Sequence, residues 1–282
     1  MKTLTLKNGT VIPKLGQGTW YLGENSSTYD EELETLRWGI EHEMTLIDTA
    51  EMYGEGAAER LVGDAIRPYD RSSLYIVSKV YPWNAGRNHI YTSLENSLKR
   101  LQTDYLDCYL LHWRGSVPLA ETVDCMEDLV DRGLIRSWGV SNLDVSDMEE
   151  LLDAGGANCV LDQVLYHLGS RGAEKYLYPW LNDNDMSFMA YCPLAQAGRL
   201  KSSLLSSSAV KEVAAAHGVD ALQILLAFVL SKENMFTVPR TGSLAHVKKN
   251  REAADIVLSD DELAKLDAAF PVPSHVTYLD MQ

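Results

Sequence analysis

The feature that most limits the fold of this chain is a short apolar run that stops at a reactive side chain and recurs along the sequence. Residues 46 and 47 precede Asp48, and Tyr53 follows five positions later. Apolar runs bounded by turn signals are typical of buried strands. Six further runs end in the same way, at residues 74–78 before Lys79, 106–111 before His112, 134–140 before Ser141 and Asn142, 160–162 before Gln163, 187–190 before Tyr191 and 235–239 before Arg240. Such strand ends are typical of a parallel α/β sheet whose carboxyl edge forms one site.

The spacing of these runs is nearly regular. From Asp48 to Tyr191, successive run ends lie 22 to 33 residues apart, and one strand, one helix and two loops take about 30 residues. With a first strand at residues 14–19, eight strands alternate with helical patterns, and no linker or composition break separates them. We therefore predict one (β/α)8 TIM barrel domain over residues 1–282, rather than a doubly wound sheet.

Two additions to the barrel are expected at its ends. Residues 4–6 and 11–12 flank Asn8 and Gly9, which form the strongest two-residue signal for a β-hairpin. Ser259 and Glu262 make a capping box that predicts an extra C-terminal helix. The remaining helices are predicted from apolar periodicity, at residues 33–40, 61–66, 90–101, 119–130, 145–152, 206–217 and 221–231.

Charge and composition exclude some classes of function. The formal net charge of −15 argues against broad binding to nucleic acid, which needs clustered Lys and Arg. The four cysteines form no C-x-x-C pair, so we expect reduced thiols. The chain starts without an apolar signal core, and its longest apolar stretch, residues 224–230, is far shorter than the ~18 residues of a membrane span. We expect a cytoplasmic monomer without a membrane or nucleic-acid partner.

Four side chains at or near run ends form a candidate catalytic set: Asp48, Tyr53, Lys79 and His112. A phenol with a pKa of about 10 is a poor acid at neutral pH, and a neighbouring ammonium is expected to lower that pKa. Asp48 would keep Lys79 charged, and His112 can hold a carbonyl oxygen. Each residue alone is more often structural than catalytic, but together they favour a proton donor aimed at a carbonyl group.

Other motifs fail on inspection. The segment from Gly16 to Tyr21 lacks the last glycine of a dinucleotide-binding fingerprint, and the segment from Gly139 to Leu143 lacks the closing glycine of a nucleophile elbow. His42 and Glu43 have no second histidine at the spacing of a zinc site, so no metal site is expected.

The same motifs resemble the aldo-keto reductase family over nearly the whole chain. The resemblance is carried by Asp48 with Tyr53-Gly54, by Lys79 after Val77-Ser78, by Leu110-Leu111-His112-Trp113 and by Gly139-Val140-Ser141-Asn142. It implies that Tyr53 donates the proton with help from Lys79 and Asp48, that His112 orients the carbonyl, and that a reduced nicotinamide supplies hydride. It also implies that Ser141, Asn142 and Gln163 bind the carboxamide, that Tyr191 stacks on the ring, and that Pro193 and Leu194 cover the pyrophosphate.

The segment from Val238 to Ser243 resembles the part of the family that binds the 2′-phosphate of NADP, where Arg240 replaces a frequent lysine. A guanidinium can bind phosphate with two donors, and the hydroxyls of Thr241 and Ser243 can add more. The resemblance extends to His246, where the family often has arginine, to Lys249, where it often has glutamate, and to Asn250, which is retained. It implies NADP(H) as cofactor.

The expected substrate wall consists of aromatic residues just after run ends: Trp20, Tyr21, Tyr81, Trp83 and Trp113. Packing over the barrel rim explains each of them equally well. The loop at residues 114–117 and the tail at residues 271–282 are short, so we expect an open pocket. The chain resembles short prokaryotic members that reduce small aldehydes, ketones and α-dicarbonyls such as methylglyoxal.

Two alternatives to a reductase remain at this point. One is a cofactor-binding barrel that regulates a partner and turns over little. The other is a phosphate-binding aldolase that uses Lys79 for a Schiff base, which Asp48 disfavours because that chemistry needs a neutral amine.

Overall fold

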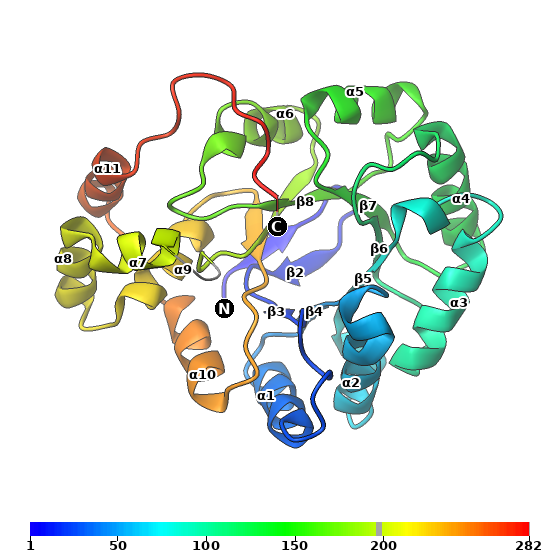
Figure 1. The fold of residues 1–282 in the computed structure, drawn as a ribbon, viewed down its shortest axis with the longest axis horizontal. Helices are drawn as coiled ribbons and strands as arrows, with labels where there is room; N and C mark the ends of the chain where they lie inside the picture. Colours follow the sequence, from blue (N-terminus) through cyan, green and yellow to red (C-terminus); the bar gives the residue numbers. More distant parts are fainter. Residues whose placement is uncertain (196–198, 282) are drawn as a thin grey trace.

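A computed structural model of the chain describes residues 1–195 and 199–281. Eight parallel strands lie side by side in chain order in one sheet. Bridges from Leu15 to Thr237 and from Gly18 to Arg240 join the last strand to the first and close the barrel. The predicted (β/α)8 barrel is therefore confirmed (Figure 1). The strands are β3 (Gln17–Gly18), β4 (Leu46–Asp48), β5 (Tyr75–Val80), β6 (Cys108–Leu111), β7 (Trp138–Ser141), β8 (Leu161–Leu165), β9 (Ser187–Tyr191) and β10 (Met235–Thr237).

Alternation along the strands decides which side chains face the inside of the barrel. Successive strand residues point to opposite faces, so Asp48 shares its face with Leu46, and Lys79 shares its face with Val77. Leu46 and Val77 belong to the apolar cluster that fills the barrel, together with Leu110. The polar groups that end the strands therefore lie directly above this inner core.

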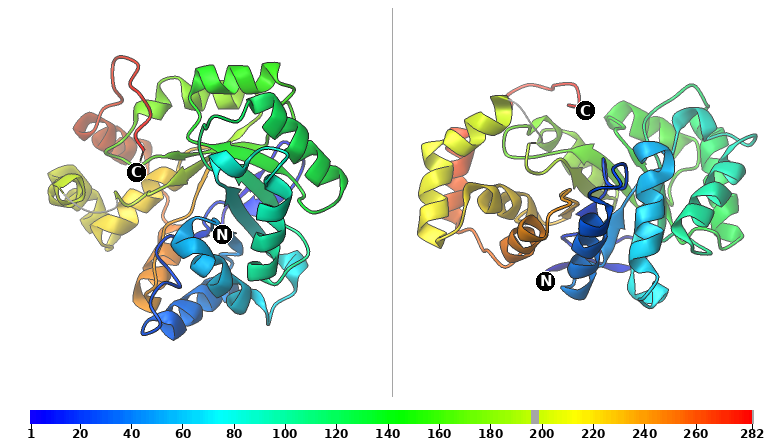
Figure 2. Two further views of the ribbon diagram at one scale, coloured as in Figure 1. Left: turned by 45° about the vertical axis from the view of Figure 1, so that its right-hand side comes forward. Right: turned by 60° about the horizontal axis from the view of Figure 1, so that its bottom comes forward.

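Helices surround the barrel on all sides (Figures 1 and 2). Their apolar faces and the outer faces of the strands form the largest buried cluster of the protein. The α-helices are α1 (Tyr29–Glu41), α2 (Ala57–Ile66), α3 (Ile90–Leu101), α4 (Leu119–Asp131), α5 (Val145–Asp153), α6 (Leu177–Asp183), α7 (Arg199–Ser206), α8 (Ser208–His217), α9 (Ala221–Leu230), α10 (Leu244–Ala253) and α11 (Asp260–Ala269). Short 3-10 turns are η1 (Tyr53–Gly56), η2 (Arg71–Ser73), η3 (Pro82–Asn84) and η4 (Gly172–Glu174).

Helix starts follow the capping signals in the sequence. Asp144 and Ser259 both form complete capping boxes, at the starts of α5 and α11. The helix predicted over residues 206–217 is wrong in its bounds, because α7 ends at Ser206 and a new helix begins at Ser208. Within the described residues no single helix is long and apolar enough to cross a bilayer, and α8 and α9 meet that test only as a pair bent by 90°.

The two ends of the chain lie on opposite faces of the barrel. The hairpin of β1 (Thr3–Thr5) and β2 (Val11–Pro13) places Leu6 and Ile12 in the apolar cluster inside the barrel, at the amino-terminal ends of the strands. After α11, the tail runs back across the opposite face toward the centre of the barrel (Figure 1). The Asp280 carboxylate accepts a hydrogen bond from Ser170, in the segment that follows β8.

Candidate functional site

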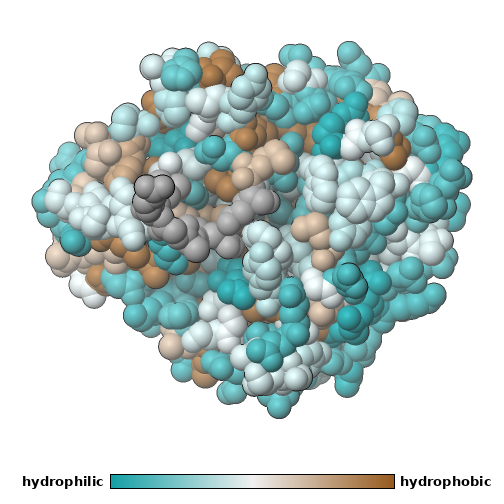
Figure 3. Space-filling view, in the orientation of Figure 1, coloured by the Kyte–Doolittle hydropathy of each residue, from teal (hydrophilic) through white to brown (hydrophobic). Residues whose placement is uncertain are grey.

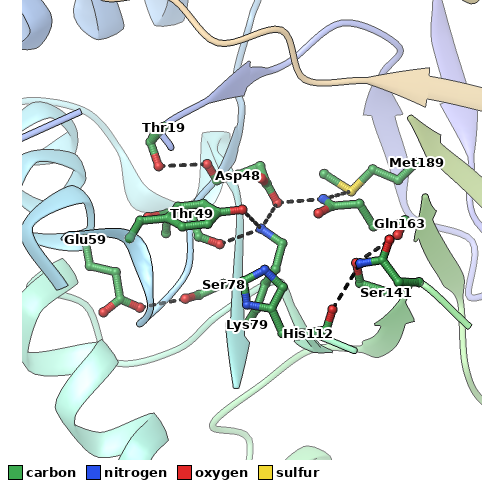
Figure 4. A network of polar contacts seen from close by, with 12 residues as sticks. Thr19, Asp48, Thr49, Glu59, Ser78, Lys79, His112, Ser141, Gln163 and Met189 are labelled. Carbon is green, nitrogen blue, oxygen red and sulfur yellow. Dashed lines mark hydrogen bonds and ion pairs between the residues drawn. The ribbon is translucent and has the colours of Figure 1, made fainter. Parts of the chain in front are cut away.

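The ammonium of Lys79 is the centre of a buried polar network at the carboxyl ends of the strands. Its Nζ atom donates to Asp48 Oδ1 at 2.7 Å, to the Thr49 carbonyl at 2.8 Å and to the Tyr53 hydroxyl at 3.1 Å (Figure 4). Lys79 is fully buried. An ammonium has three donors and no acceptor, so these contacts use all of its hydrogen-bonding capacity and fix its position.

Tyr53 reaches the network from the turn that follows β4. Its amide donates to the Ala50 carbonyl at 3.1 Å, and Gly54 and Glu55 adopt positive φ angles immediately after it. The tight turn brings the ring from the loop to the inside of the mouth. Because Lys79 donates to the phenolic oxygen, the proton of that hydroxyl remains available for another acceptor.

The pKa of Tyr53 differs from the sequence-based expectation. Burial, with a further contribution from the Asp48 carboxylate, raises the pKa of Tyr53 well above its usual value. Burial therefore outweighs the lowering expected from Lys79, because removing the phenolate from water costs more than one ammonium restores. Burial also lowers the pKa of Lys79, against the opposing effect of Asp48. Tyr53 thus keeps its proton at neutral pH.

His112 lies beside Tyr53, just after β6. Their ring centroids are 5.8 Å apart with an angle of 75° between the planes. Burial, and then the charge of Lys79, lowers the pKa of His112 well below its usual value, so the imidazole is neutral. Its Nδ1 atom is buried and has no hydrogen-bond partner among the described residues.

Three amide and hydroxyl side chains form the opposite wall. The Gln163 amide donates to Asp48 Oδ1 at 2.8 Å, which links this wall to the Lys79 network. Ser141 Oγ donates to the Gln163 carbonyl at 2.8 Å, and Asn142 Nδ2 donates to Ser141 Oγ at 3.0 Å. Tyr191 in turn donates to Asn142 Oδ1 at 2.9 Å. The four residues predicted to bind a nicotinamide are therefore joined to one another.

A first cavity of about 230 Å³ opens above this network. Two of the four predicted catalytic residues, Tyr53 and His112, line it, whereas Lys79 lies beneath Tyr53 and Asp48 beneath Lys79. Its lining consists of Trp20, Met52, Tyr53, His112, Trp113, Ser141, Asn142, Gln163, Tyr191 and Met281.

The predicted aromatic wall divides into two groups. Trp20 and Trp113 line the first cavity, whereas Tyr21, Tyr81 and Trp83 lie outside its lining. Tyr21 stacks on Trp20 with 4.6 Å between ring centroids, and Tyr81 stacks on Trp83 at 4.4 Å. The second group therefore supports the rim instead of forming the wall, and the side chain of Trp83 is 58% exposed.

Two methionines of the lining were not predicted. Met52 precedes Tyr53 in the chain, where a methionine gives no specific signal. Met281 comes from the tail, which therefore reaches the mouth although it is short. Extended tail residues carry no periodic pattern that indicates where the chain crosses the barrel.

A second cavity of about 530 Å³ lies beside the end of β10. Six residues predicted to bind cofactor line it: Leu194, Arg240, Thr241, Ser243, His246 and Asn250. Pro193 is buried next to Leu194 and lines neither cavity. Lys201 and Lys249 also face it, although Lys249 pairs with Asp220 at 2.8 Å. Arg240 Nε donates to the Trp20 carbonyl at 2.8 Å, which connects the walls of the two cavities.

The two cavities fit the two ends of a phosphorylated dinucleotide. The second offers guanidinium, ammonium and hydroxyl donors of the kind that bind phosphate. The first offers an aromatic face and amides around the unpartnered Nδ1 atom of His112, and buried polar atoms are normally hydrogen-bonded. The face of the molecule into which the two cavities open is largely hydrophilic around them (Figure 3).

Comparison with known proteins agrees with this geometry. Residues 14–270 match the sequence profile of the Aldo/keto reductase family. The chain is 50% identical to methylglyoxal reductase YeaE from Escherichia coli (strain K12), over 99% of both chains, and 31% identical to the glyoxal reductase from Bacillus subtilis (strain 168), over 94% of this chain and 92% of that one. An aldo/keto reductase from Klebsiella pneumoniae, solved in complex with NADP and acetate, superposes with a TM-score of 0.96 at 50% identity and covers 100% of this chain and 99% of that one.

Proposed function

Because this chain belongs to the aldo/keto reductase family, we propose that it is an NADPH-dependent reductase of small aldehydes, ketones and α-dicarbonyls, with Tyr53 as the proton donor. The observation that carries the proposal is the hydrogen bond from Lys79 to the Tyr53 hydroxyl. That contact occupies the phenolic oxygen from below and leaves the phenolic proton for an acceptor in the first cavity. A phenol that keeps its proton at neutral pH is in the correct state to protonate an alcohol oxygen as it forms.

Each neighbour of Tyr53 has a distinct role in this proposal. Lys79 stabilises the phenolate that remains after proton transfer, and Asp48 keeps Lys79 in place and charged. His112, which is neutral, donates a hydrogen bond to the substrate carbonyl and holds it next to the phenol. A neutral imidazole suits this task because it has one donor and does not compete for the Tyr53 proton.

The cofactor is held by residues of both cavities. When bound, NADPH supplies the hydride that the reduction needs. Ser141, Asn142 and Gln163 would hold the carboxamide and Tyr191 the ring, while Arg240, Thr241, Ser243, His246 and Asn250 would bind the phosphorylated adenosine end. The Klebsiella relatives crystallised with NADP and with NADPH support this choice of cofactor.

The substrate class follows from the size and polarity of the first cavity. About 230 Å³ must accommodate the nicotinamide as well as the substrate, so only a small carbonyl compound fits. The relatives named as methylglyoxal and glyoxal reductases support α-dicarbonyls as substrates. We further propose that the enzyme is a cytoplasmic monomer, since the site is built from one chain and the four cysteines form no C-x-x-C pair.

Replacing the phenolic hydroxyl tests the proposal directly. Wild-type protein is expected to oxidise NADPH in the presence of methylglyoxal. Tyr53→Phe should lower kcat by about 10²–10⁴-fold, the usual contribution of a general acid, and should leave the Kd for NADPH, measured by fluorescence titration, within twofold of wild type. Unchanged turnover in the variant contradicts the role of Tyr53. Tight NADPH binding by a wild-type protein without turnover supports a regulatory barrel instead.

A further inference from the structure

A second buried carboxylate lies behind the strand that carries Lys79. Glu59, on α2, is fully buried on the outer side of β5. Its Oε1 atom accepts a hydrogen bond from Ser78 Oγ at 2.6 Å (Figure 4). Its Oε2 atom accepts one from Arg100 Nε, also at 2.6 Å. Both carboxylate oxygens are therefore held in place, and the Arg100 guanidinium forms an ion pair with the group.

Strand geometry connects Glu59 to the catalytic network. Ser78 and Lys79 are neighbours on β5, so their side chains point to opposite faces of the sheet. Lys79 faces the inside of the barrel, and Ser78 faces the helix layer, where it meets Glu59. Gly63, also on α2, lies so close to α3 that a Cβ atom at this position would be 2.5 Å from the Arg100 carbonyl oxygen. Because α2 and α3 pack this closely, Glu59 has little freedom to move.

The buried ammonium of Lys79 has few negative charges near it, and Glu59 is one of them. Only one of the three hydrogen-bond partners of Lys79 is a carboxylate, and the same oxygen of Asp48 also accepts from Gln163. Burial lowers the pKa of Lys79, Asp48 opposes this effect most strongly, and the charge of Glu59 opposes it next. A buried ammonium beside a single shared carboxylate is easily deprotonated.

We propose that Glu59 is a positioning residue for the reduction, whose negative charge keeps Lys79 protonated beneath Tyr53 from the far side of β5. The inference rests on the proposed function of the site. Glu59 does not contact the first cavity, so it acts only through Lys79.

Other ionisable groups near this network set the background for a test. Those that face Lys79 or Tyr53 are Asp48 of β4, Cys108 of β6, His112 after β6, Tyr191 at the end of β9 and Cys192 after it. Those around Glu59 are Glu51, Arg100 and Tyr109, of which Tyr109 has a buried hydroxyl without a partner among the described residues. None of these is changed in the variants below, apart from Arg100 in one double variant.

The test measures the protonation of Lys79 directly and without turnover. Protein labelled with ¹³C at lysine Cε is titrated by NMR between pH 6 and 11, and the Lys79 signal is assigned by its loss in Lys79→Met. In Glu59→Gln the Lys79 signal should titrate at lower pH than in wild type. The basic limb of kcat/KM for methylglyoxal should move in the same direction, so that activity at pH 9 relative to pH 6.5 falls roughly threefold to tenfold, since one pH unit is tenfold in the protonation ratio.

Matched variants separate charge from packing. Glu59→Asp keeps the carboxylate and Ser78→Ala removes only the hydrogen bond, so both should titrate and react as wild type at high pH. If Glu59→Gln does not fold because Arg100 is left unpaired, Glu59→Gln combined with Arg100→Gln removes both charges of the pair. A smaller downward shift is then expected, because loss of the Arg100 cation opposes the effect of losing the carboxylate.

The proposal is overturned if the Lys79 signal of Glu59→Gln titrates as in wild type, or if Ser78→Ala and Glu59→Asp shift it equally. The NMR titration needs no substrate, so this failure differs from failure of the proposed function, in which wild-type protein does not reduce carbonyl compounds at all.

Discussion

Arg240 shows how one side chain can serve two parts of the site. Its Nε atom holds the carbonyl of Trp20, which lines the first cavity, and its guanidinium lies 5.9 Å from the ring centroid of Tyr21. The same residue lines the second cavity beside Thr241 and Ser243. The remaining guanidinium donors therefore face a place that suits a phosphate.

Replacing Arg240 should change cofactor choice more than catalysis. Arg240→Gln is expected to raise the Kd for NADPH by about tenfold or more, because a hydrogen bond to a charged group contributes about 1.5–3 kcal/mol. The Kd for NADH should change by less than threefold. Fluorescence titration of both cofactors measures the difference, with Arg240→Lys as the control that keeps the charge. An equal loss for both cofactors would instead assign Arg240 to the Trp20 contact alone.

For single residues, the sequence indicates which side chains lie at the site better than it indicates how deeply they are buried. Asp48, Lys79 and His112 were predictable because each follows an apolar run, and the barrel brings run ends together. The raised pKa of Tyr53 was not predictable, since it depends on burial by residues distant in sequence. Met281 gave no signal, because its place depends on the path of an irregular tail.

Closure of the barrel depends on the contact between its first and last strands, β3 and β10, which we call the seam. β3 has only two residues, Gln17 and Gly18, and the seam is completed by the Gly16 amide, which donates to the Thr237 carbonyl at 2.9 Å, and by the Gly18 amide, which donates to the Pro239 carbonyl at 3.1 Å. A Cβ atom on Gly16 would lie 2.2 Å from Leu46 Cδ2 and 2.6 Å from the Leu46 carbonyl oxygen.

Adding that methyl group should weaken the barrel. Gly16→Ala is expected to lower the free energy of unfolding by about 1–3 kcal/mol, the usual cost of overpacking a buried site, because the Leu46 backbone cannot move without shifting β4. Urea denaturation measures the loss. Val11→Ala, on the exposed face of the hairpin, should change stability by less than about 0.5 kcal/mol. Equal stability of the two variants would show that the seam can relax.

Elements were predicted from the sequence where their periodicity is strong. The apolar stripes of α3 and α4 and the boxes at Asp144 and Ser259 indicate their helices clearly. α6 was missed because it has seven residues and contains Pro179. α7 was missed and the start of α8 was predicted at residue 206 instead of Ser208, because the sequence around Ser207 contains serine after serine and no glycine or proline.

For the molecule as a whole, the tail and the segment after β8 act as one unit. Arg171 binds Asp267 at 2.7 Å and the Phe270 carbonyl at 2.7 Å, and Ser170 binds Asp280. His167 is buried in the same place. Burial lowers the pKa of His167 to about 4, against the opposing charge of Asp280.

This buried imidazole should make the fold sensitive to acid. Between about pH 6.5, the usual histidine value, and pH 4, the unfolded chain binds a proton that folded His167 does not. Stability therefore falls as pH falls through this window. His167→Gln should lose less stability between pH 7 and pH 5 than wild type does, as measured by urea denaturation. His275→Gln, which changes an exposed histidine, should behave as wild type; the same acid dependence in His167→Gln would contradict the assignment.

The position of the tail has a practical consequence for handling the protein. Met281 borders the first cavity, whereas the hairpin at the start of the chain covers the opposite end of the barrel. An affinity tag or fluorescent fusion joined after the last residue would stand in the entrance that substrates use. The same label joined before Met1 would emerge on the far side and leave that entrance clear.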